Sequence, residues 1–258
     1  IDQGIDPWCR TSDDETLLHR ACNNGQLEMT QYLVETYPAM LFQMDNSRST
    51  TAHNAAHSGN VALLTYLINL GIDPWCKSSE EYTLLHMACY NGQLEMVKHL
   101  FGTYPKMLHQ VDSIKRTPAH DAAFNGNVAV LTYLIDRGTD PWCKTTEEET
   151  LLHKACNNGQ MEMTKHLVET YPKMLYQVDN IKRSPAHHAA ESGNVAVLRY
   201  LIDRGIDPWC RTSEEETCMH RACNKGQLEM TKYLLETYPK MLHEVDNMGR
   251  TPAHHATV

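Results

Sequence analysis

The sequence predicts an all-α protein, a solenoid in which short helical hairpins stack on one another and loops protrude between them. Two observations lead to this prediction. First, the tetrapeptide Asp-Pro-Trp-Cys recurs every 67 residues, beginning at Asp6, Asp73, Asp140 and Asp207. Second, each stretch divides into two halves that share the pattern Thr-x-x-His-x-Ala-(Ala/Cys)-x-x-Gly, followed by apolar residues at helical spacing. Repeats of this length indicate units that bury their apolar surface by stacking on their neighbours.

Each half is predicted to form a first helix, a tight turn and a second helix. The Thr at the start, such as Thr16, supplies a hydroxyl that caps the first turn. Where a proline follows, as at Pro118, it occupies the first helical position, which needs no amide hydrogen. A glycine such as Gly25 ends the first helix in a left-handed turn. The apolar side of the second helix in the first half contains Leu27, Met29, Tyr32, Leu33 and Val34.

The repeated pattern resembles the ankyrin repeat, whose hallmark is Thr-Pro-Leu-His-x-Ala followed by Gly and a second helix. The resemblance covers the whole chain. We interpret residues 1–258 as one ankyrin-repeat array built from double units at about 6–72, 73–139, 140–206 and 207–258. The residues that open its helical hairpins are Thr16, Thr50, Thr83, Thr117, Thr150, Ser184, Thr217 and Thr251.

The sequence departs from the ankyrin pattern in three ways, one of which is a longer connection through Tyr37-Pro38, Tyr104-Pro105, Tyr171-Pro172 and Tyr238-Pro239. The first halves replace the family proline with Leu17, Leu84, Leu151 and Cys218. At the hairpin tips the expected glycine is present only at Gly249, and its place is taken elsewhere by Arg48, Lys115 and Lys182. We expect these changes to alter the shape of the loops and to leave the stacking of the hairpins intact.

Composition and charge narrow the classes of function. The chain has 258 residues, of which 23 are basic and 32 acidic, for a net charge of −9. Because nucleic-acid binders usually carry a basic stripe and this chain has none, we expect no nucleic-acid partner. No apolar run approaches the ~18 residues of a membrane span, and the start of the sequence does not read as a signal peptide. The nine cysteines are odd in number and recur with the repeat, which predicts free thiols in the reducing cytoplasm.

Both ends of the sequence fall within a repeat. Residues 1–4 match residues 202–205, at the end of a second helix, and the chain stops at Val258, early in another repeat. Solenoids need polar terminal repeats for solubility, and neither end shows one. We therefore expect either a segment of a larger intracellular protein or a piece that stacks end to end on copies of itself.

Histidine, cysteine and tryptophan recur at fixed places in the repeat. The resemblance implies that the imidazole of His19 and its equivalents is a structural tie between adjacent hairpins. Cys9, His19 and Cys22 recur in all four double units, so zinc is an alternative, but small buried thiols account for both cysteines. We expect no metal and no cofactor. Trp8 and its equivalents are expected to pack on the next loop, with an exposed recognition ladder as the alternative.

Differences between the double units indicate where a partner binds. The resemblance implies that partners contact the hairpin tips and the exposed side of the first helix. Residues 73–139 have aromatic or apolar side chains at four such positions where residues 140–206 have Glu149, Lys154, Asn157 and Glu191. Exposed aromatic clusters are typical of binding hot spots, whereas ordinary drift at surface positions is the alternative. The predicted protein-binding residues are Tyr82, Met87, Tyr90, Ile114, Asp121, Phe124, Lys154, His188 and Glu191.

The sequence contains no catalytic motif of a common class. It lacks Gly-x-Ser-x-Gly, His-Glu-x-x-His and a phosphate-binding glycine loop. We therefore predict a protein–protein interaction scaffold rather than an enzyme, which binds a protein partner through its concave face and hairpin tips. The alternative is a structural, filament-forming protein that associates with itself, because the repeats are so alike.

Overall fold

The computed structural model describes residues 6–256, which are helical apart from loops and an isolated antiparallel bridge between Met44 and Thr50. This confirms the all-α fold class. The chain divides into two compact units, Ile1–Ala122 with Ala129–Thr139 and Ala123–Val128 with Asp140–Val258. The main division, between Thr139 and Asp140, coincides with a predicted boundary between double units. Residues 1–4, where the sequence predicts the end of a second helix, lie outside the described residues.

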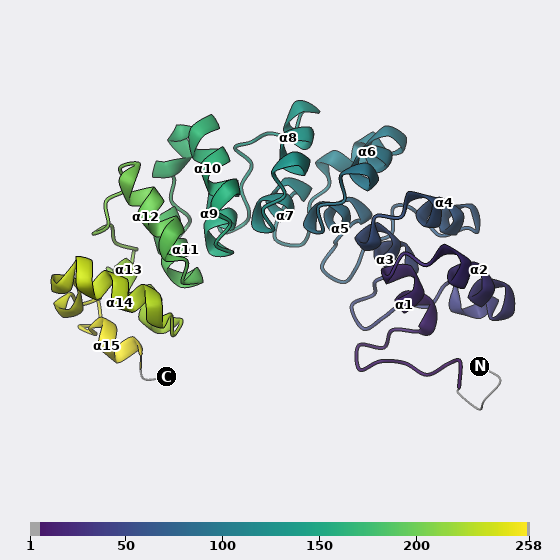
Figure 1. Ribbon diagram of the computed structural model, residues 1–258, viewed down its shortest axis with the longest axis horizontal. Helices are drawn as coiled ribbons and strands as arrows, with labels where there is room; N and C mark the ends of the chain where they lie inside the picture. Colours follow the sequence, from purple (N-terminus) through teal and green to yellow (C-terminus); the bar gives the residue numbers. More distant parts are fainter. Residues whose placement is uncertain (1–5, 257–258) are drawn as a thin grey trace. The chain divides into compact units, whose positions relative to one another are not determined.

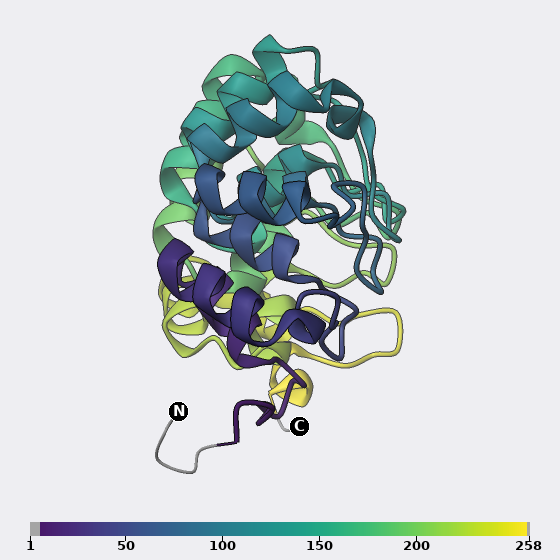
Figure 2. The same ribbon diagram turned by 90° about the vertical axis from the view of Figure 1, so that its right-hand side faces the viewer.

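Helical hairpins follow one another through the first unit (Figure 1). Its helices are α1 (Leu17–Asn23), α2 (Leu27–Thr36), α3 (Thr51–Ser58), α4 (Val61–Asn69), α5 (Leu84–Tyr90), α6 (Leu94–Thr103), α7 (Pro118–Phe124) and α8 (Val128–Asp136), with short 3-10 helices η1 (Pro38–Met40) and η2 (Pro105–His109). The first helices α1, α3 and α5 pack side by side, and so do the second helices α2, α4 and α6. The long loops of this unit project from the same side of its hairpins (Figure 2).

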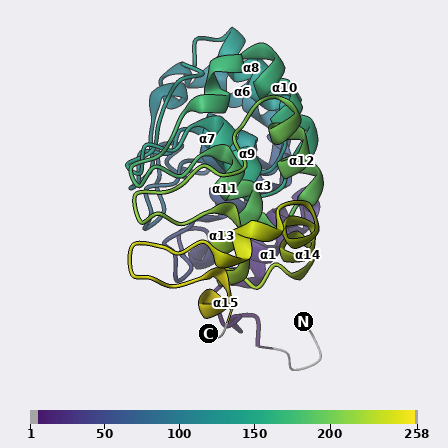
Figure 3. The same ribbon diagram turned by 90° about the vertical axis from the view of Figure 1, so that its left-hand side faces the viewer.

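The second unit repeats this arrangement (Figure 3). Its helices are α9 (Leu151–Asn157), α10 (Met161–Thr170), α11 (Pro185–Ser192), α12 (Val195–Asp203), α13 (Cys218–Asn224), α14 (Leu228–Thr237) and α15 (Pro252–His255), with 3-10 helices η3 (Pro172–Tyr176) and η4 (Pro239–His243). First helices α9, α11, α13 and α15 pack in succession, as do second helices α10, α12 and α14. The stacking of neighbouring hairpins that the sequence predicts is therefore present within each unit.

The predicted helix boundaries rest on short-range hydrogen bonds. At α1 the Thr16 hydroxyl accepts from the backbone N–H of His19, and the backbone N–H of Thr16 donates to Nδ1 of His19. Such a capping box satisfies two donors that a helix start leaves open. Gly25 and Gly59 close the first helices with φ of 67° and 76°, in the left-handed region predicted for them.

The repeated histidine ties α3, α5, α9, α11 and α13 each to the loop of the next hairpin, as predicted, whereas Nε2 of His19 in α1 is buried without such a partner among the described residues. In these tied helices Nδ1 of the histidine accepts from the capping residue, so Nε2 carries the hydrogen and donates to a backbone carbonyl at 3.1–3.2 Å. These donor–acceptor pairs are His53–Tyr82, His86–Arg116, His153–Arg183, His187–Glu216 and His220–Arg250. Burial lowers the pKa of His86 to about 4 and that of His153 to about 3, so both rings are neutral near pH 7.

One expectation about the loops is corrected and another is confirmed. Arg48, Lys115 and Lys182 keep φ of 59–61°, the same left-handed conformation as Gly249 at 74°, so the backbone of the hairpin tip is not reshaped there. The tryptophans pack on the next loop, as expected. Each meets the edge of the tyrosine that opens the connection after the second helix, as in Trp75–Tyr104 with ring centres 5.8 Å apart.

The core of each unit is a continuous row of apolar side chains between successive hairpins. Leu84, Leu85, Met96 and Leu100 are fully buried in the first unit, and their equivalents in the second unit are buried as well. Burying one such side chain contributes about 1.5–3 kcal/mol, so the stack is held by many similar contributions along its length. Among the described residues, no helix combines the length and apolar character that crossing a membrane requires.

Candidate protein-binding surface

A groove of about 480 Å³ lies on the first unit, where the first helices meet the loops that precede them. Asn23, Asn54 and Met87 reach it from α1, α3 and α5, and Tyr82 and Arg116 reach it from the loops. Tyr82 and Met87 belong to the same half of one double unit, and the other three side chains come from three further halves. The stacking of hairpins therefore assembles the groove from short segments that are far apart in the sequence.

Tyr82 is the aromatic wall of the groove and is held on three sides. Its hydroxyl donates to Oδ1 of Asp121 at 2.5 Å. The guanidinium of Arg116 lies 5.1 Å from the centre of its ring, and the ring of His86 lies 5.0 Å away on another side. Burial and the Asp121 carboxylate raise the pKa of Tyr82, so the hydroxyl keeps its proton and remains a donor. The ring is half-buried, which leaves part of it available to a bound molecule.

The groove carries more acidic than basic side chains. Glu15, Asp45 and Glu80 line it together with one guanidinium, that of Arg116. Arg116 is fixed by Asp112, whose Oδ2 lies 2.6 Å from its Nε, and it lies 3.6 Å from Glu80. Because the acids exceed the fixed cation, the groove favours a ligand with a positive group.

The structure divides the predicted residues of the first unit into accessible and buried ones. Met87 is half-buried and lines the groove, while Tyr90 at the end of α5 and Ile114 at a loop tip are exposed. The expectation that Asp121 lies on the exposed side of its helix is wrong, because only 2% of its surface is accessible. Its carboxylate accepts the hydrogen bond that the Tyr82 hydroxyl donates. Phe124 is half-buried and ends α7, whose last two residues fall in the second unit although the rest of that helix lies in the first.

In the second unit each predicted residue contacts charged side chains of the chain itself. His188 is only 1% exposed, so the expectation of an exposed side chain is wrong there too. It lies between two carboxylates, with Nε2 3.4 Å from Asp179 and Nδ1 4.0 Å from Glu149. Lys154 pairs with Glu149, which is itself buried. Glu191 lies 3.6 Å from Arg183 and 2.5 Å from Arg221.

Hydrogen bonds and ion pairs set the charge of this second cluster. Burial alone would raise the pKa of Asp179, but hydrogen bonds from His188 and Arg183 outweigh it and hold that pKa well below its usual range. Burial would also raise the pKa of Glu149, and the contact with Lys154 instead lowers it. Both carboxylates are therefore charged near neutral pH, and both are neutralised within the chain.

Sequence reasoning missed that these positions work in pairs 39 residues apart. Tyr82 with Asp121 in one double unit is replaced by Glu149 with His188 in the next and by Glu216 with His255 in the last. In the two later double units the carboxylate lies beside the imidazole, with Nδ1 of His188 4.0 Å from Glu149 and Nδ1 of His255 3.9 Å from Glu216. The exchange of both members at once is visible in the aligned repeats and is the signal that identifies the contact.

The thiols do not form the group that the Cys-x9-His-x2-Cys spacing raised as an alternative. Cys22 is buried beside the Thr30 hydroxyl, and burial raises its pKa to about 12, whereas Cys9 is exposed. Within residues 6–256, two other sets place three metal-ligand atoms close together: His187, Cys210 and Cys218, and Glu216, Asp246 and His255. In the acidic set, Asp246 lies 2.7 Å from Arg250 and Glu216 lies 3.0 Å from Arg221, so arginines already neutralise it.

Comparisons with known proteins agree with the repeat seen in sequence and structure. The family described as Ankyrin repeats (3 copies) matches residues 1–78, 53–145 and 120–212, and Ankyrin repeats (many copies) matches residues 201–256. A Transient receptor potential cation channel subfamily A member 1 homolog of Caenorhabditis elegans is 27% identical over 198 residues, 77% of this chain and 16% of the channel protein. Ankyrin repeat protein nuc-2 of Neurospora crassa is 25% identical over 248 residues, 82% of this chain and 23% of that protein.

A relative of nearly the same length has similar identity. The Probable 26S proteasome regulatory subunit p28 of Saccharomyces cerevisiae is 26% identical over 192 residues, 72% of this chain and 84% of that protein. The chain therefore spans less than a quarter of the first two relatives and most of the third. Repeats of this kind generally mediate protein–protein interaction. The family matches extend over most of the sequence, and the chain belongs to the ankyrin-repeat family.

Proposed function

We propose that this chain is a non-enzymatic binding module that holds a segment of a protein partner in the groove of its first unit. The contrast between equivalent positions supports the proposal. In the first unit Tyr82 and Met87 line an open groove, with Tyr90 and Ile114 exposed. The second unit has charged side chains at the places of Tyr82 and Met87, and these are neutralised by one another. Aromatic and apolar side chains in a groove are the usual anchors of protein interfaces.

The chemistry of the groove indicates a partner segment that presents a basic side chain beside an apolar one. Glu15, Asp45 and Glu80 would accept the cation, and the half-buried ring of Tyr82 and the Met87 side chain would contact the apolar group. The hydroxyl groups of Ser47, Ser49 and Ser79 offer donors and acceptors to a peptide backbone. We further propose that the chain functions in the cytoplasm as part of a larger protein. Its nine cysteines, an odd number in a chain this long, support the reducing compartment, and the longer relatives support the larger protein.

The test is an exchange of equivalent residues between double units. The variant Y82E/D121H/M87K/Y90N gives the first unit the side chains found at 149, 188, 154 and 157, and it changes the buried pair as a pair. Cross-linking in native lysate followed by mass spectrometry should capture a distinct protein with the wild type and lose it with the variant. Lys77 and Lys115 should carry the cross-links, whereas their equivalents Lys144 and Lys182 should not.

Two results keep this experiment decisive. A helical circular dichroism signal equal to that of the wild type shows that the variant is folded. The reciprocal variant E149Y/H188D/K154M, which changes the second unit, should keep the partner. The proposal fails when the quadruple variant captures the same protein with the same cross-links as the wild type.

We propose self-association as a second candidate, because α2 has an exposed apolar face. Met29 is 48% exposed, whereas Met96 at the same repeat position is fully buried under the preceding hairpin. Leu17, Ala21, Met29 and Leu33 surround a shallow apolar hollow of about 300 Å³ at this face. A second copy of the chain would cover it as the preceding hairpin covers Met96. Sedimentation equilibrium should then show concentration-dependent mass that M29E/Y32E abolishes, and a monomer at all concentrations would contradict this candidate.

A further inference from the structure

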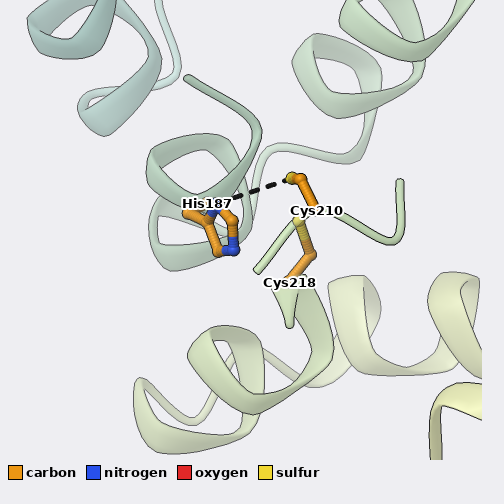
Figure 4. Close-up of side chains that lie close together, drawn as sticks. All are labelled: His187, Cys210 and Cys218. Carbon is orange, nitrogen blue, oxygen red and sulfur yellow. Dashed lines mark hydrogen bonds between the residues drawn. The ribbon is translucent and has the colours of Figure 1, made fainter. Parts of the chain in front are cut away.

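Two cysteines of the last double unit face each other across a loop. Cys210 precedes a loop tip, and Cys218 is the first residue of α13. Their sulfur atoms and a ring nitrogen of His187 in α11 all lie within 4.8 Å of one another. Figure 4 shows the three side chains converging, with both thiols on the same side of the imidazole. The stacking of α11 on α13 places the histidine beside the pair.

The two thiols differ in access. Cys210 is half-buried, with its sulfur 3.2 Å from the Ser184 hydroxyl and 3.7 Å from Nδ1 of His187. Cys218 is fully buried behind it. A hydrogen bond from Cys218 lowers the pKa of Cys210, while the same contact and burial raise the pKa of Cys218. An accessible thiolate in front of a buried thiol is the arrangement in which one sulfur reacts and the other resolves it.

The first unit contains a matched site without the second thiol. There Cys76 lies 3.3 Å from the Thr50 hydroxyl and 3.8 Å from Nδ1 of His53, so the loop and the histidine are placed as in the last double unit. The residue that corresponds to Cys218 is Leu84, which is fully buried. Leu17 and Leu151 occupy the same place in the other double units. Packing therefore accepts leucine at this position, and the thiol of Cys218 adds chemistry rather than volume.

The imidazole of His187 is already committed to the fold. Its Nδ1 accepts from the backbone N–H of Ser184 at 3.1 Å, and its Nε2 donates to the carbonyl of Glu216 at 3.2 Å. A metal ion would have to displace one of these hydrogen bonds, and each closes a helix start or joins two hairpins. Chemistry between the two sulfur atoms leaves both in place, so the geometry favours a dithiol over a metal centre.

We propose that Cys210 and Cys218 are a modification site that a hydroperoxide converts to a reversible disulfide. The thiolate of Cys210 attacks one oxygen of the hydroperoxide. The O–O bond breaks, the sulfur is oxidised to a sulfenic acid, and the leaving alkoxide takes a proton to become an alcohol. Cys218 then gives up its proton and attacks that sulfur. The S–O bond breaks, water leaves and the S–S bond forms, so two thiols are oxidised and one peroxide is reduced.

The disulfide would tie a projecting loop to the start of α13. The tied segment contains Arg211, which contacts Glu244 and donates to the carbonyl of Val245 at 3.2 Å in the next loop. It also contains Glu214, whose backbone carbonyl accepts a hydrogen bond from the backbone N–H of Asn247 at 2.9 Å. Oxidation therefore acts on the contact between two neighbouring loops, which project from the same side of the hairpins (Figure 3).

The test treats the fully reduced chain with stoichiometric hydrogen peroxide, blocks the remaining thiols by alkylation and maps the peptides. Trypsin cleaves after Arg211, so the two cysteines fall in separate peptides, 205–211 and 212–221. The expected result is that these two peptides become joined before the exposed thiol of Cys9 is oxidised, and that dithiothreitol separates them. Oxidation of Cys9 first, with 205–211 and 212–221 unjoined, overturns the proposal.

Two variants make the result specific to this pair. C218L gives the site the residue found in the other double units and should fold, and its Cys210 should stop at a sulfenic acid that dimedone traps. L84C should transplant the site and join Cys76 to the new thiol in the first unit. Two results together would overturn the dithiol proposal in favour of a metal site. The wild type would show a thiolate-to-metal charge-transfer band with Co²⁺ that C218L removes, and peroxide would not join the two cysteines.

Discussion

The same repeat position is built with opposite chemistry in the two units. In the first unit a tyrosine hydroxyl donates to a buried aspartate, and an aromatic ring is left beside an open groove. In the second unit a buried glutamate faces a buried histidine, and Lys154 and Arg183 complete a closed set of charges. The backbone frame is common to both, since the capping boxes and histidine ties are the same. The side chains at this repeat position are thus exchanged in pairs on a backbone frame that does not change.

The largest effect is expected from breaking one pair. Y82E alone places a second carboxylate against the buried Asp121, which should lower the free energy of unfolding by about 3 kcal/mol or more. The double variant Y82E/D121H recreates the pair of the second unit and should recover most of that loss. Urea denaturation of the two variants and of D121H gives the coupling energy. Equal stability of the single and double variants would contradict the paired exchange.

A smaller effect on stability is expected at Lys154 and Met87, the equivalent positions beside the two pairs. K154M removes the ammonium that neutralises the buried Glu149, and we expect a loss of about 2 kcal/mol. The reciprocal M87K places a lysine at a half-buried position of the open groove and should change stability by less than about 1 kcal/mol. Denaturant unfolding of both variants in the same buffer measures the two losses of stability. Equal losses for K154M and M87K would contradict this prediction.

The histidine ties predict how stability depends on pH. The folded pKa of His86 is about 4, below the value of about 6.5 for an unfolded histidine, so unfolding takes up a proton between these values. Stability present above pH 6.5 is therefore lost as the pH falls through about 4. H86Q should reduce the change in the free energy of unfolding with pH by up to about 1.4 kcal/mol per pH unit in this range. H153Q should have the same effect over a range that extends down to about pH 3. Unchanged slopes would show that these rings are not neutral in the fold.

The smallest effect concerns the loop tips, which are alike in the two units. Lys115 and Lys182 hold left-handed backbone at φ of 60° and 61°, where glycine has no steric penalty. K115G and K182G should each raise stability by less than about 1 kcal/mol, because the gain is partly offset by the freedom of glycine in the unfolded chain. Calorimetry of the two variants should give matching shifts, and a loss in either would point to a contact made by the lysine side chain.

The fold was predictable because each hairpin is specified locally. The Thr, His and Gly of the pattern set the helix starts, the ties and the turns, and these reappear with little change in every repeat. The candidate site was predictable only in part. Tyr82, Met87 and the exposed Ile114 follow from their repeat positions, whereas the burial of Asp121 and His188 depends on a partner 39 residues away. Periodicity alone does not report which side of a short helix a neighbouring loop covers.

The tryptophan of each double unit gives the molecule its own set of optical reporters. Trp8, Trp75, Trp142 and Trp209 each lie edge-on to a tyrosine, with ring centres 5.8–6.2 Å apart. Every indole is partly exposed and is coupled to the end of one second helix, so its emission reports whether that helix is still docked. Leaving one indole in place and changing the other three to phenylalanine would follow the melting of one double unit at a time, without an added dye.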